Sequence, residues 1–482
     1  MNRVVSVQTM QAWDRDCIQR RGIPEKTLML TAAQGVTEVV LERLSANESV
    51  TCLCGSGNNG GDGFAVAWLL KQANRPVRIV FVGKEERLSE AARFYLEAAR
   101  AAHVPITTVW EETENELLVD ALFGVGLTRP VTGEYETLIA RMNASKKPIV
   151  SVDIPSGIHA DTGRVMGIGV QADQTVLMQY HKRGHLLGEG RRYSGKCTVA
   201  KLSEDGDFPF AEEERIVTER EVSALLPPRP FDSHKGKNGH SLLVVGSDRY
   251  HGAAVLSAKA CLRAGTGLLT VLTVDAVRNA LDAVPEAITA SVGKSWSDTD
   301  ETALLHLSKK TAVGIGCGIG EAELGRLLTA ALDMKVPLVL DADALNYLAE
   351  HRTMWNRLHE NVILTPHPGE MARLLGKSVE DVLLHPVEAT SAFPCTVLLK
   401  GATTVIRQGN RIGYSLFGNA GLAKGGSGDV LTGILVALLS QGLAPFDAAI
   451  AGAYLLGTKA DEALLLLGNR MLLATDLLDV LR

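Results

Sequence analysis

Short apolar runs alternate with longer helical patterns along the whole chain. In the first half, four runs are typical of strands, and an apolar helical stretch over residues 64–72 follows the first; the runs cover 50–54, 77–82, 117–120 and 149–152. Five similar runs in the second half cover 241–245, 269–272, 338–340, 362–364 and 397–399. Strands that alternate with helices predict parallel sheets with crossover helices, which is an α/β fold.

This alternation is interrupted between residues 204 and 230, where acidic residues and prolines gather. The acidic residues cluster around Pro209, and three further prolines follow. Dense acidic charge and proline disfavour a packed strand and suit a connection between domains. We therefore expect two α/β domains of unequal size, at residues 1–216 and 217–482.

The composition is that of a globular protein that acts on small molecules. With 482 residues, of which 46% are hydrophobic and 22% charged, the chain is long enough for two or three domains with substantial cores. Its formal net charge of -6 offers no basic surface for nucleic acid or for an anionic membrane. We therefore expect no nucleic-acid partner and no membrane partner.

Cysteine usage and the amino terminus indicate the compartment. The seven cysteines include no Cys-x-x-Cys pair, so the sequence predicts neither a disulfide framework nor a zinc site. The amino terminus has no continuous apolar segment of the secretory type, and no run approaches the ~18 apolar residues that a membrane helix needs. These features predict a cytoplasmic protein.

A glycine-rich segment over residues 55–63 joins the first strand to its helix. Strand, glycine turn and helix can bind a phosphate, because glycines let backbone N–H groups approach an anion at the positive end of the helix. The spacing matches the dinucleotide-binding pattern, but an ordinary tight turn can have the same spacing. Asn58, Asn59 and Asp62 favour a binding site, since their oxygens suit a cation or a ribose.

Two further polar turns follow strands of the first domain. Asp120 ends one strand and leads into a turn over 124–130, and Asp153 ends the next. The carboxyl ends of parallel strands face one crevice in an open sheet, so we expect the three turns to converge there. Each aspartate alone could also cap a helix or stabilise a turn.

The second domain has its own glycine-rich segment, over residues 418–429, before an apolar helix over 430–439. Its glycines offer several N–H donors and a favourable helix dipole to one anion. Asp429 has two interpretations there: a cap of the helix, or a base that takes a proton from an attacking hydroxyl during phosphoryl transfer. The adjoining glycines favour the base, because a cap does not require them.

Polar residues also follow other strands of the second domain. The segment 400–404 has donors fit for a nucleotide phosphate, although a solvated hairpin would look the same. Asp341 and Asp343 follow another strand, and His367 lies between two prolines in the segment 365–370. A lone histidine is more often structural, but one held rigidly between two prolines on such a loop favours a substrate contact.

These segments resemble two known families. GGSGD (425–429), KG (400–401) and TPHPGE (365–370) resemble the ADP-dependent NAD(P)H-hydrate dehydratases, which have a ribokinase-like fold. NNGGDG (58–63) and VDIPSG (152–157) are similar to the NAD(P)H-hydrate epimerases. Together the resemblances cover nearly the whole chain, in the order of the fused bacterial bifunctional nicotinamide nucleotide repair proteins.

The resemblance implies the architecture and the reactions. The first domain would be a Rossmann-like three-layer sandwich, and the second would be ribokinase-like. The substrates would be ADP with NADHX and NADPHX, which are NADH and NADPH with water added across the nicotinamide 5,6 double bond. The second domain would convert the S hydrate to NAD(P)H, AMP and phosphate, with Mg²⁺ screening the phosphates, and the first would interconvert the R and S hydrates.

The resemblance also implies roles for residues of the second domain. Asp429 would take the proton of the C6 hydroxyl, which attacks the β-phosphoryl group of ADP while glycine N–H groups stabilise the charge. The hydrate would contact Ala254, Gly318, His367 and Asp429. The AMP moiety would contact Lys400, Gly401, Ala402, Thr403, Thr404 and Gly428.

In the first domain, the resemblance implies potassium coordination by Asn59, Asp120 and Ser156, and Asp153 is the candidate proton-transfer residue, although the sequence does not indicate the route of epimerisation. Thr31 and Ala33 stand where the epimerases usually have Asn and Gly, so that wall of the pocket is expected to differ. In the second domain, Ala420 and Lys424 replace the usual Pro and Thr. Hydrate binding would fall on Asn58, Asn59, Gly60, Gly61, Asp62, Gly124, Val125, Gly126, Leu127, Thr128, Arg129, Pro130 and Asp153.

Two other functions fit the same residues. A ribokinase-like small-molecule kinase would use the same glycines and Asp429, but it would release a stable phosphorylated product. The first domain could instead be a non-catalytic nucleotide-sensing module that regulates the second. A homo-oligomer is expected in each case.

Overall fold

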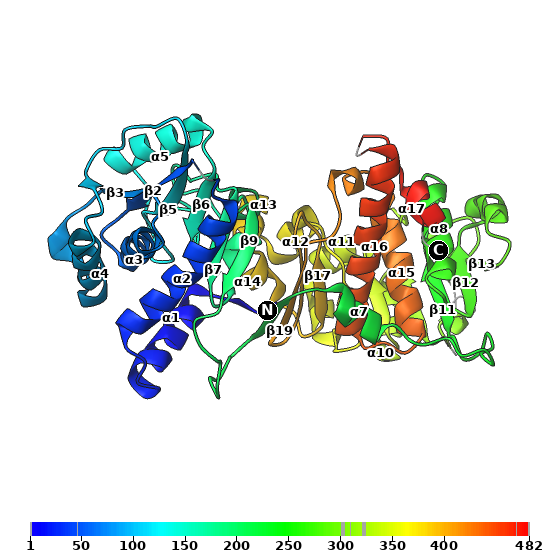
Figure 1. The fold of residues 1–482 in the computed structure, drawn as a ribbon. Helices are drawn as coiled ribbons and strands as arrows, with labels where there is room; N and C mark the ends of the chain where they lie inside the picture. Colours follow the sequence, from blue (N-terminus) through cyan, green and yellow to red (C-terminus); the bar gives the residue numbers. More distant parts are fainter. Residues whose placement is uncertain are drawn as a thin grey trace. The chain divides into compact units, whose positions relative to one another are not determined.

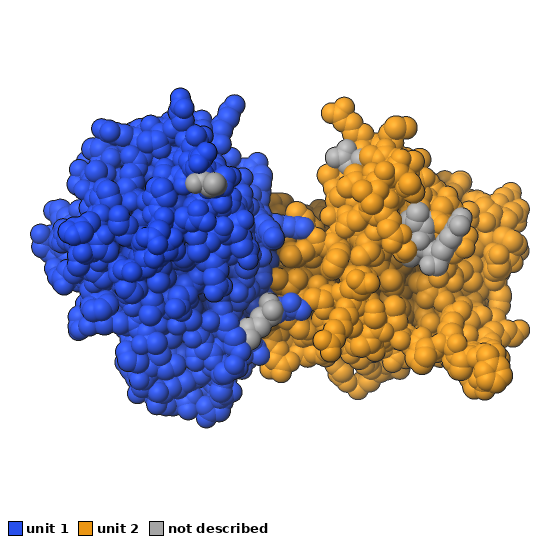
Figure 2. Space-filling view, viewed as in Figure 1, with its two compact units in different colours: residues 1–211 blue, residues 212–482 orange. Residues whose placement is uncertain are grey.

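The chain forms two compact units in the computed structural model, Met1–Ala211 and Glu212–Arg482, drawn in blue and orange in Figure 2. The structure describes residues 2–45, 47–299, 304–308, 310–320, 324–468 and 470–480. The chain divides after Ala211 rather than near residue 216, because β10 (Glu213–Ile216) pairs in parallel with β19 (Arg411–Ser415) of the second unit.

The acidic stretch was expected to form a connection, and that expectation is wrong at β10. Glu214 is buried there, and its Oε2 accepts a hydrogen bond of 2.6 Å from the Tyr414 hydroxyl. Pairing with β19 supplies the backbone hydrogen bonds of the strand, and Tyr414 supplies a partner for the one buried carboxylate. Tertiary contacts therefore override the local composition.

The first unit is built on a seven-stranded parallel sheet in the described residues, with the order β4-β3-β2-β5-β6-β7-β9. A separate short pair joins β1 (Val4–Val5) to β8 (His181–Lys182). The strands of the main sheet are β2 (Ser49–Cys54), β3 (Val77–Phe81), β4 (Ile106–Thr107), β5 (Glu116–Ala121), β6 (Ile149–Val152), β7 (Gln174–Met178) and β9 (Lys196–Ala200).

Helices cover both faces of this sheet (Figure 1). The chain runs from β2 through α3 to β3 and on through α4 to β4, but it runs in the opposite direction from β5 through α5 to β6. Since such crossovers are right-handed, the reversal places α5 on the face opposite α3 and α4. The helices are α1 (Val7–Arg15), α2 (Glu25–Arg43), α3 (Asn58–Gln72), α4 (Glu90–Ala101), α5 (Glu134–Ser145) and α6 (Gly190–Tyr193).

Helix α3 begins at Asn58, so most of the glycine-rich segment belongs to the helix rather than to the loop that was expected. A Cβ at Gly60 would lie 1.9 Å from the carbonyl oxygen of Gly55, and one at Gly63 would lie 2.6 Å from Cys54 Sγ. Only glycine allows so close an approach. These two glycines therefore serve the packing of α3 on β2.

The second unit is built on a ten-stranded sheet in the described residues, with the order β10-β19-β18-β17-β16-β15-β14-β11-β12-β13. Its pairs are parallel except β17 with β18 and β18 with β19. The remaining strands are β11 (His240–Val244), β12 (Leu268–Thr273), β13 (Ile288–Ser291), β14 (Ala312–Ile315), β15 (Leu338–Leu340), β16 (Val362–Leu364), β17 (Thr396–Leu399) and β18 (Thr404–Gln408).

The strand order of this sheet reverses between β11 and β14. Helix α8 joins β11 to β12, whereas α10, α11 and α12 accompany the strands from β14 to β17 in the opposite direction, which places them on the other face. Helices α15 and α16 join α8 on its face (Figure 1). The helices are α7 (Glu219–Leu225), α8 (His251–Arg263), α10 (Gly325–Asp333), α11 (Asp343–Glu350), α12 (Pro368–Leu375), α13 (Val379–Leu384), α14 (Pro386–Thr390), α15 (Ser427–Ser440), α16 (Pro445–Leu467) and α17 (Ala474–Val480).

Helix α15 is nearly all apolar after its first turn and is buried over most of its length. It contacts α8, α16 and the strands β11, β14 and β15. Burial on this scale fixes the position of its amino terminus. Within the described residues, no helix combines the length and the apolar character needed to cross a membrane.

Candidate functional site

The first unit has a cavity of about 650 Å³ beyond the carboxyl ends of β2 and β5, where the strand order reverses. Ligands of open α/β sheets bind at such reversal points. Ten of the residues predicted to bind the hydrate line it: Asn58, Asn59, Asp62, Gly124, Val125, Gly126, Leu127, Thr128, Arg129 and Asp153.

The other three predicted hydrate-binding residues, Gly60, Gly61 and Pro130, are not among the residues that line this cavity. A Cβ at Gly61 would lie 2.7 Å from Met29 Cε, so Gly61, like Gly60, allows the close packing of α3. Met29 itself lines the cavity, so Gly61 lies behind a residue of the cavity wall.

Asp153 follows β6 with a φ of 63°, a left-handed conformation that is uncommon for a residue other than glycine. Its N–H donates to the Val176 carbonyl oxygen (2.8 Å), and its own carbonyl oxygen accepts from His185 Nε2 (2.8 Å). Its Oδ1 accepts from Met178 N (2.9 Å) and pairs with the ammonium of Lys182, which is fully buried. These contacts fix the carboxylate at the cavity wall.

His185 supports this arrangement as a neutral ring. Burial, with the nearby charge of Lys182, lowers the pKa of His185 well below its ordinary value. Its Nδ1 accepts from Lys182 N (3.0 Å), so Nε2 carries the proton that is donated to Asp153. Lys182 and His185 were not predicted, because no spacing in the sequence links them to Asp153.

Two more carboxyl groups line the same cavity. Burial, with the negative charges of Asp153, Asp14 and Glu25, raises the pKa of Asp62 well above its ordinary value. Burial also raises the pKa of Asp14 to about 6, although the charge of Lys182 opposes the rise. Asp14 was not predicted, because it lies in α1, far in sequence from the glycine-rich segment.

The three predicted potassium ligands lie close together. Asp120 Oδ1 accepts from the Ser156 hydroxyl (2.5 Å), and Oδ2 accepts from Ser156 N (2.8 Å) and the Ser151 hydroxyl (2.7 Å). Asn59 Nδ2 donates to the Phe123 carbonyl oxygen (3.0 Å), and Phe123 N donates to Ser156 Oγ (2.9 Å). The cluster thus brings together a carboxylate, a hydroxyl and a carbonyl oxygen, which suit a hard cation, while Asn59 faces the carbonyl oxygen with its amide nitrogen.

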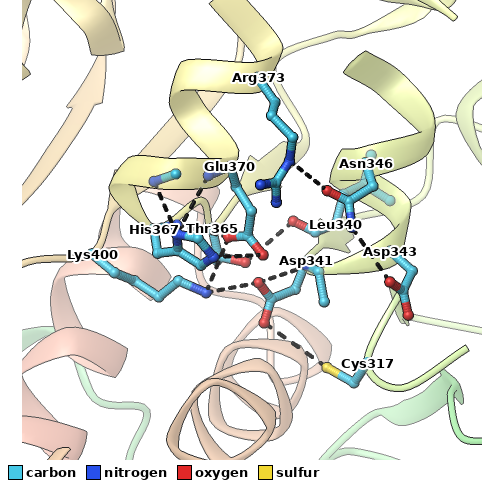
Figure 3. Close-up of polar contacts among 12 residues, drawn as sticks. Cys317, Leu340, Asp341, Asp343, Asn346, Thr365, His367, Glu370, Arg373 and Lys400 are labelled. Carbon is cyan, nitrogen blue, oxygen red and sulfur yellow. Dashed lines mark hydrogen bonds and ion pairs between the residues drawn. The ribbon is translucent and has the colours of Figure 1, made fainter. Parts of the chain in front are cut away.

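The site of the second unit is centred on Asp341, at the carboxyl end of β15 (Figure 3). Asp341 is buried. Its Oδ1 accepts from Lys400 Nζ and Ala342 N, each at 2.9 Å, and its Oδ2 accepts from the Thr432 hydroxyl at 2.9 Å. Thr432 lies on α15, so Asp341 links that helix to Lys400, the residue that follows β17.

Lys400 lies between two carboxylates (Figure 3). Its Nζ is 2.9 Å from Asp341 Oδ1 and 3.8 Å from Glu370 Oε2. Burial opposes its charge, but the two carboxylates outweigh burial and raise the pKa of the Lys400 ammonium. The predicted nucleotide segment 400–404 is the hairpin between β17 and β18, in which Gly401 and Ala402 are exposed.

Asp429 is the third residue of α15, so it is not the residue that caps the helix. The cap position is Gly426, with a φ of 97°, and no side chain makes a capping bond there. Asp429 is half-buried, and burial raises its pKa to about 6, while a hydrogen bond with Cys317 lowers it. The geometry thus excludes the N-cap interpretation, and the role of Asp429 as a base stays a prediction.

The start of α15 presents donors that have no partner in the described residues. The N–H groups of Ser427, Gly428 and Asp429 precede the first helical bond, which runs from Val430 N to Gly426 O. The buried Ser427 hydroxyl likewise has no hydrogen-bond partner. A Cβ at Gly428 would lie 3.6 Å from Lys400 Nζ, so these donors lie beside the lysine. Free donors, a helix dipole and an ammonium form an anion-binding site.

His367 caps α12. Its Nδ1 accepts from Gly369 N (3.0 Å) and Glu370 N (3.3 Å), and Glu370 Oε2 accepts from His367 N (2.7 Å). The ring is half-exposed, and its Nε2 lies 3.5 Å from Glu370 Oε1. A structural role for the histidine is therefore established, and its predicted contact with substrate would have to use Nε2.

Gly318 and Ala254 mark the reversal point of this sheet. Gly318 follows β14 with a φ of 65°, and a Cβ there would lie 2.7 Å from Tyr250 Cβ and 2.8 Å from Ala253 Cβ. Ala254 is fully buried on α8. Gly318 is thus held by packing against the start of α8, and the fully buried Ala254 side chain is not exposed to a ligand at this point.

The fold and these sites define a class of protein: a two-domain, doubly wound α/β enzyme with a site at each reversal point. Residues 241–482 match the family model described as NAD(P)H-hydrate dehydratase, and residues 25–184 match the model of the YjeF-related protein N-terminus. The matches follow the two units of the chain.

Several curated relatives match at full length. The bifunctional NAD(P)H-hydrate repair enzyme Nnr of Vibrio cholerae is 37% identical, over 99% of this chain and 97% of the relative. That of Escherichia coli is 36% identical over 97% and 91%, and that of Thermofilum pendens is 35% identical over 96% and 92%. The chain belongs to the family of bifunctional NAD(P)H-hydrate repair enzymes, which confirms the predicted fold class and function.

A solved structure is also similar to part of the chain. The ADP/ATP-dependent NAD(P)H-hydrate dehydratase of Bacillus subtilis, co-crystallised with ATP/Mg²⁺, is 31% identical and covers 55% of this chain and 95% of its own, with a TM-score of 0.46.

Proposed function

We propose that the second unit dehydrates the S hydrate of NAD(P)H with ADP, and that the first unit interconverts the R and S hydrates. The observation that carries the first part is the start of α15, where free N–H groups, the unpartnered Ser427 hydroxyl and the half-buried Asp429 lie beside Lys400. One site thus offers charge stabilisation for a phosphoryl group and a base for the hydroxyl that attacks it.

In this proposal Asp429 removes the proton of the C6 hydroxyl, and the oxygen attacks the β-phosphorus of ADP, releasing AMP. The α15 N–H groups donate to the transferred phosphoryl oxygens, and Lys400 contributes positive charge. Phosphate then leaves C6 as the lone pair of the ring nitrogen forms a double bond to C6, and loss of a C5 proton gives NAD(P)H. Mg²⁺ would screen the phosphates, with Asp341 and Asp429 as the carboxylates of the same site.

The other binding residues that we propose for the second unit are those predicted from the sequence. We place AMP on the hairpin 400–404 and Gly428, and the hydrate on Ala254, Gly318, His367 and Asp429. Reversal points at which two loops diverge commonly hold a nucleotide, which supports a hydrate close to Gly318. His367 would donate to the hydrate through Nε2, since Nδ1 accepts the capping bonds.

In the first unit, the proposal places the R or S hydrate in the cavity beyond β2 and β5, with Asp153 as the proton-transfer residue. The fixed position of the Asp153 carboxylate, held by Lys182 and Met178 N, supports that role. K⁺ would be held by Asn59, Asp120 and Ser156, where it would supply positive charge near the phosphates of the hydrate. A homo-oligomer in the cytoplasm stays a prediction.

One experiment tests both activities. The full chain is incubated with mixed R and S hydrates and ADP, and each epimer, NAD(P)H and phosphate are measured by chromatography. Consumption of both epimers with equal amounts of AMP and phosphate is expected. Consumption of the S epimer alone would refute the epimerase assignment, and a stable phosphorylated product would instead support a kinase.

A further inference from the structure

The cavity of the first unit contains a carboxyl group that the proposed function does not use. Asp14 lies on α1 and lines the cavity together with Asp62 and Asp153. It does not cap its helix, because the cap is Ser6, whose side chain accepts from Thr9 N. Within the described residues, the Asp14 carboxylate also makes no hydrogen bond and no ion pair.

Asp16, two residues further on, shows what a structural carboxylate in this segment looks like. It pairs with Arg20 and with Arg21, the latter at 2.7 Å, and these bonds lower its pKa. Asp16 is not among the residues that line the cavity. The two aspartates therefore differ in environment although they are close in sequence. Among the described residues, Asp14 makes none of the stabilising side-chain contacts that Asp16 makes.

The surroundings of Asp14 favour a proton donor. Burial and the nearby negative charges raise its pKa to about 6, so part of the population is protonated near neutral pH. Asp153, by contrast, pairs with the buried ammonium of Lys182, which suits a proton acceptor. Two carboxyl groups of one cavity that differ in this way can act as an acid and a base. The charged groups that face Asp14 are Arg15, Glu25, Asp62, Asp153 and Lys182.

We infer that Asp14 is the proton donor, and Asp153 the proton acceptor, that open the hydrated nicotinamide ring at C6 during epimerisation. This inference rests on the proposed function of the cavity. It adds a catalytic residue from α1, which precedes the part of the chain that matches the family model.

The ring-opening step is balanced by the two carboxyl groups. C6 carries both the hydroxyl group and the ring nitrogen N1. Asp153 accepts the hydroxyl proton, the oxygen forms a C6=O double bond, and the C6–N1 bond breaks with its electron pair moving to N1, which takes the proton of Asp14. Rotation about the C5–C6 bond then presents the other face of the aldehyde, and closure reverses each transfer. Closure returns the proton of N1 to Asp14 and the proton of Asp153 to the C6 oxygen, so Asp14 is again protonated and Asp153 is again a carboxylate. No water, oxidant or metal is consumed.

The test compares the wild-type full chain with Asp14→Asn, Asp14→Glu and the matched control Asp16→Asn. R to S conversion is followed by chromatography between pH 5 and 8. Asp14→Asn is expected to lower kcat about 100-fold or more, the usual contribution of a general acid, with KM within about threefold. Asp14→Glu should recover part of kcat. The wild-type rate should fall as the pH rises above about 6, and Asp14→Asn should lose this dependence.

Two further measurements separate chemistry from structure. ADP-dependent dehydration of the S hydrate by the same Asp14→Asn protein should match the wild type, since that reaction belongs to the other unit. A single turnover in H₂¹⁸O should give an S hydrate that keeps its original C6 oxygen, whereas incorporation of solvent oxygen would overturn ring opening.

The outcomes distinguish this inference from the proposed function. Failure of the wild type to convert R to S hydrate would refute the epimerase assignment itself. An active wild type with Asp14→Asn within threefold of it would overturn only the role of Asp14. An equal loss in Asp16→Asn would overturn it as well, because the effect would then arise from disturbance of α1.

Discussion

Replacement of Asp429 by Asn should abolish dehydration and, at the same time, stabilise the fold at neutral pH. The carboxylate is half-buried at the start of α15, and burial raises its pKa from an ordinary value of 3.8 to about 6. The folded protein therefore carries an unfavourable charge whenever Asp429 is ionised. Asn has nearly the same shape without this charge.

The size of the effect follows from the pKa. At ~1.36 kcal/mol for each tenfold change in proton affinity, a rise from 3.8 to about 6 corresponds to roughly 3 kcal/mol. Because Asp429 is only half-buried, solvent screens part of this energy. We expect Asp429→Asn to raise the free energy of unfolding by about 1–3 kcal/mol above pH 7.

The sign depends on pH in a defined way. Because the folded pKa is raised, the contribution of Asp429 to stability is fully present below pH 3.8 and is lost as the pH rises through about 6. The variant lacks this group, so its advantage should be near zero at pH 4, should grow between pH 4 and 6, and should stay constant above pH 7. Wild-type dehydration should rise over the same window, because the base must be ionised.

The assay measures urea unfolding of the second-unit transition and dehydration of the S hydrate for wild type, Asp429→Asn and Asp447→Asn. Asp447 is the third residue of α16, as Asp429 is of α15, but it pairs with Arg411 at 2.7 Å. Its replacement should lower stability by about 0.2–1 kcal/mol and leave dehydration unchanged. Asp429→Asn should lower kcat by about 100-fold or more.

A variant that is less stable than wild type at pH 8, or a difference that does not change with pH, would show that burial does not penalise this carboxylate. Retained dehydration at pH 7 would remove Asp429 as the base.

Three further predictions follow from the two sites. Asp153→Asn should lower R to S conversion about 100-fold or more and leave dehydration intact; unchanged epimerisation would exclude the residue. Lys182→Met should cost about 3–5 kcal/mol in unfolding experiments, because Asp153 loses its buried partner, and Asp153→Asn in the same chain should recover part of the loss. Gly428→Ala should raise KM for ADP at least tenfold without lowering Tm, since the new methyl group would make only ordinary contacts, 3.5 Å from Asp341 Oδ2 and 3.6 Å from Lys400 Nζ; an unchanged KM would place the phosphates elsewhere.

Much of the fold was determined by local sequence patterns. The nine apolar runs correspond to β2, β3, β5, β6, β11, β12, β15, β16 and β17. These strands could be recognised because a strand covered by helices on both faces is apolar at nearly every position. Such a run is visible in the sequence without knowledge of the neighbouring strands. The segment that becomes β10 could not be recognised, since its charged residues are accommodated only by pairing with β19 and by the Tyr414 hydroxyl.

The residues of the motifs could also be recognised from the sequence, because the glycines and the aspartates at strand ends are close together in it. Asp429, Asp153 and Asn58 were found in this way. The glycine-rich segment at 55–63 was interpreted as a binding loop. In the structure, Gly60 and Gly63 instead allow helix α3 to pack closely on the end of β2. A glycine that admits a ligand and one that admits a neighbouring helix look alike in the sequence.

The sequence by itself determined two α/β domains, the family and the segments that lie at the two candidate sites, because these depend on residue types that recur at short spacing. Only the tertiary structure decided which groups act together. The pairs Asp153 with Lys182 and Asp341 with Lys400 join residues far apart in the chain, and Asp14 reaches the first cavity from another helix. Burial and neighbouring charge, which raise the pKa of Asp14 and shift that of Lys400, exist only once the strands and helices have packed.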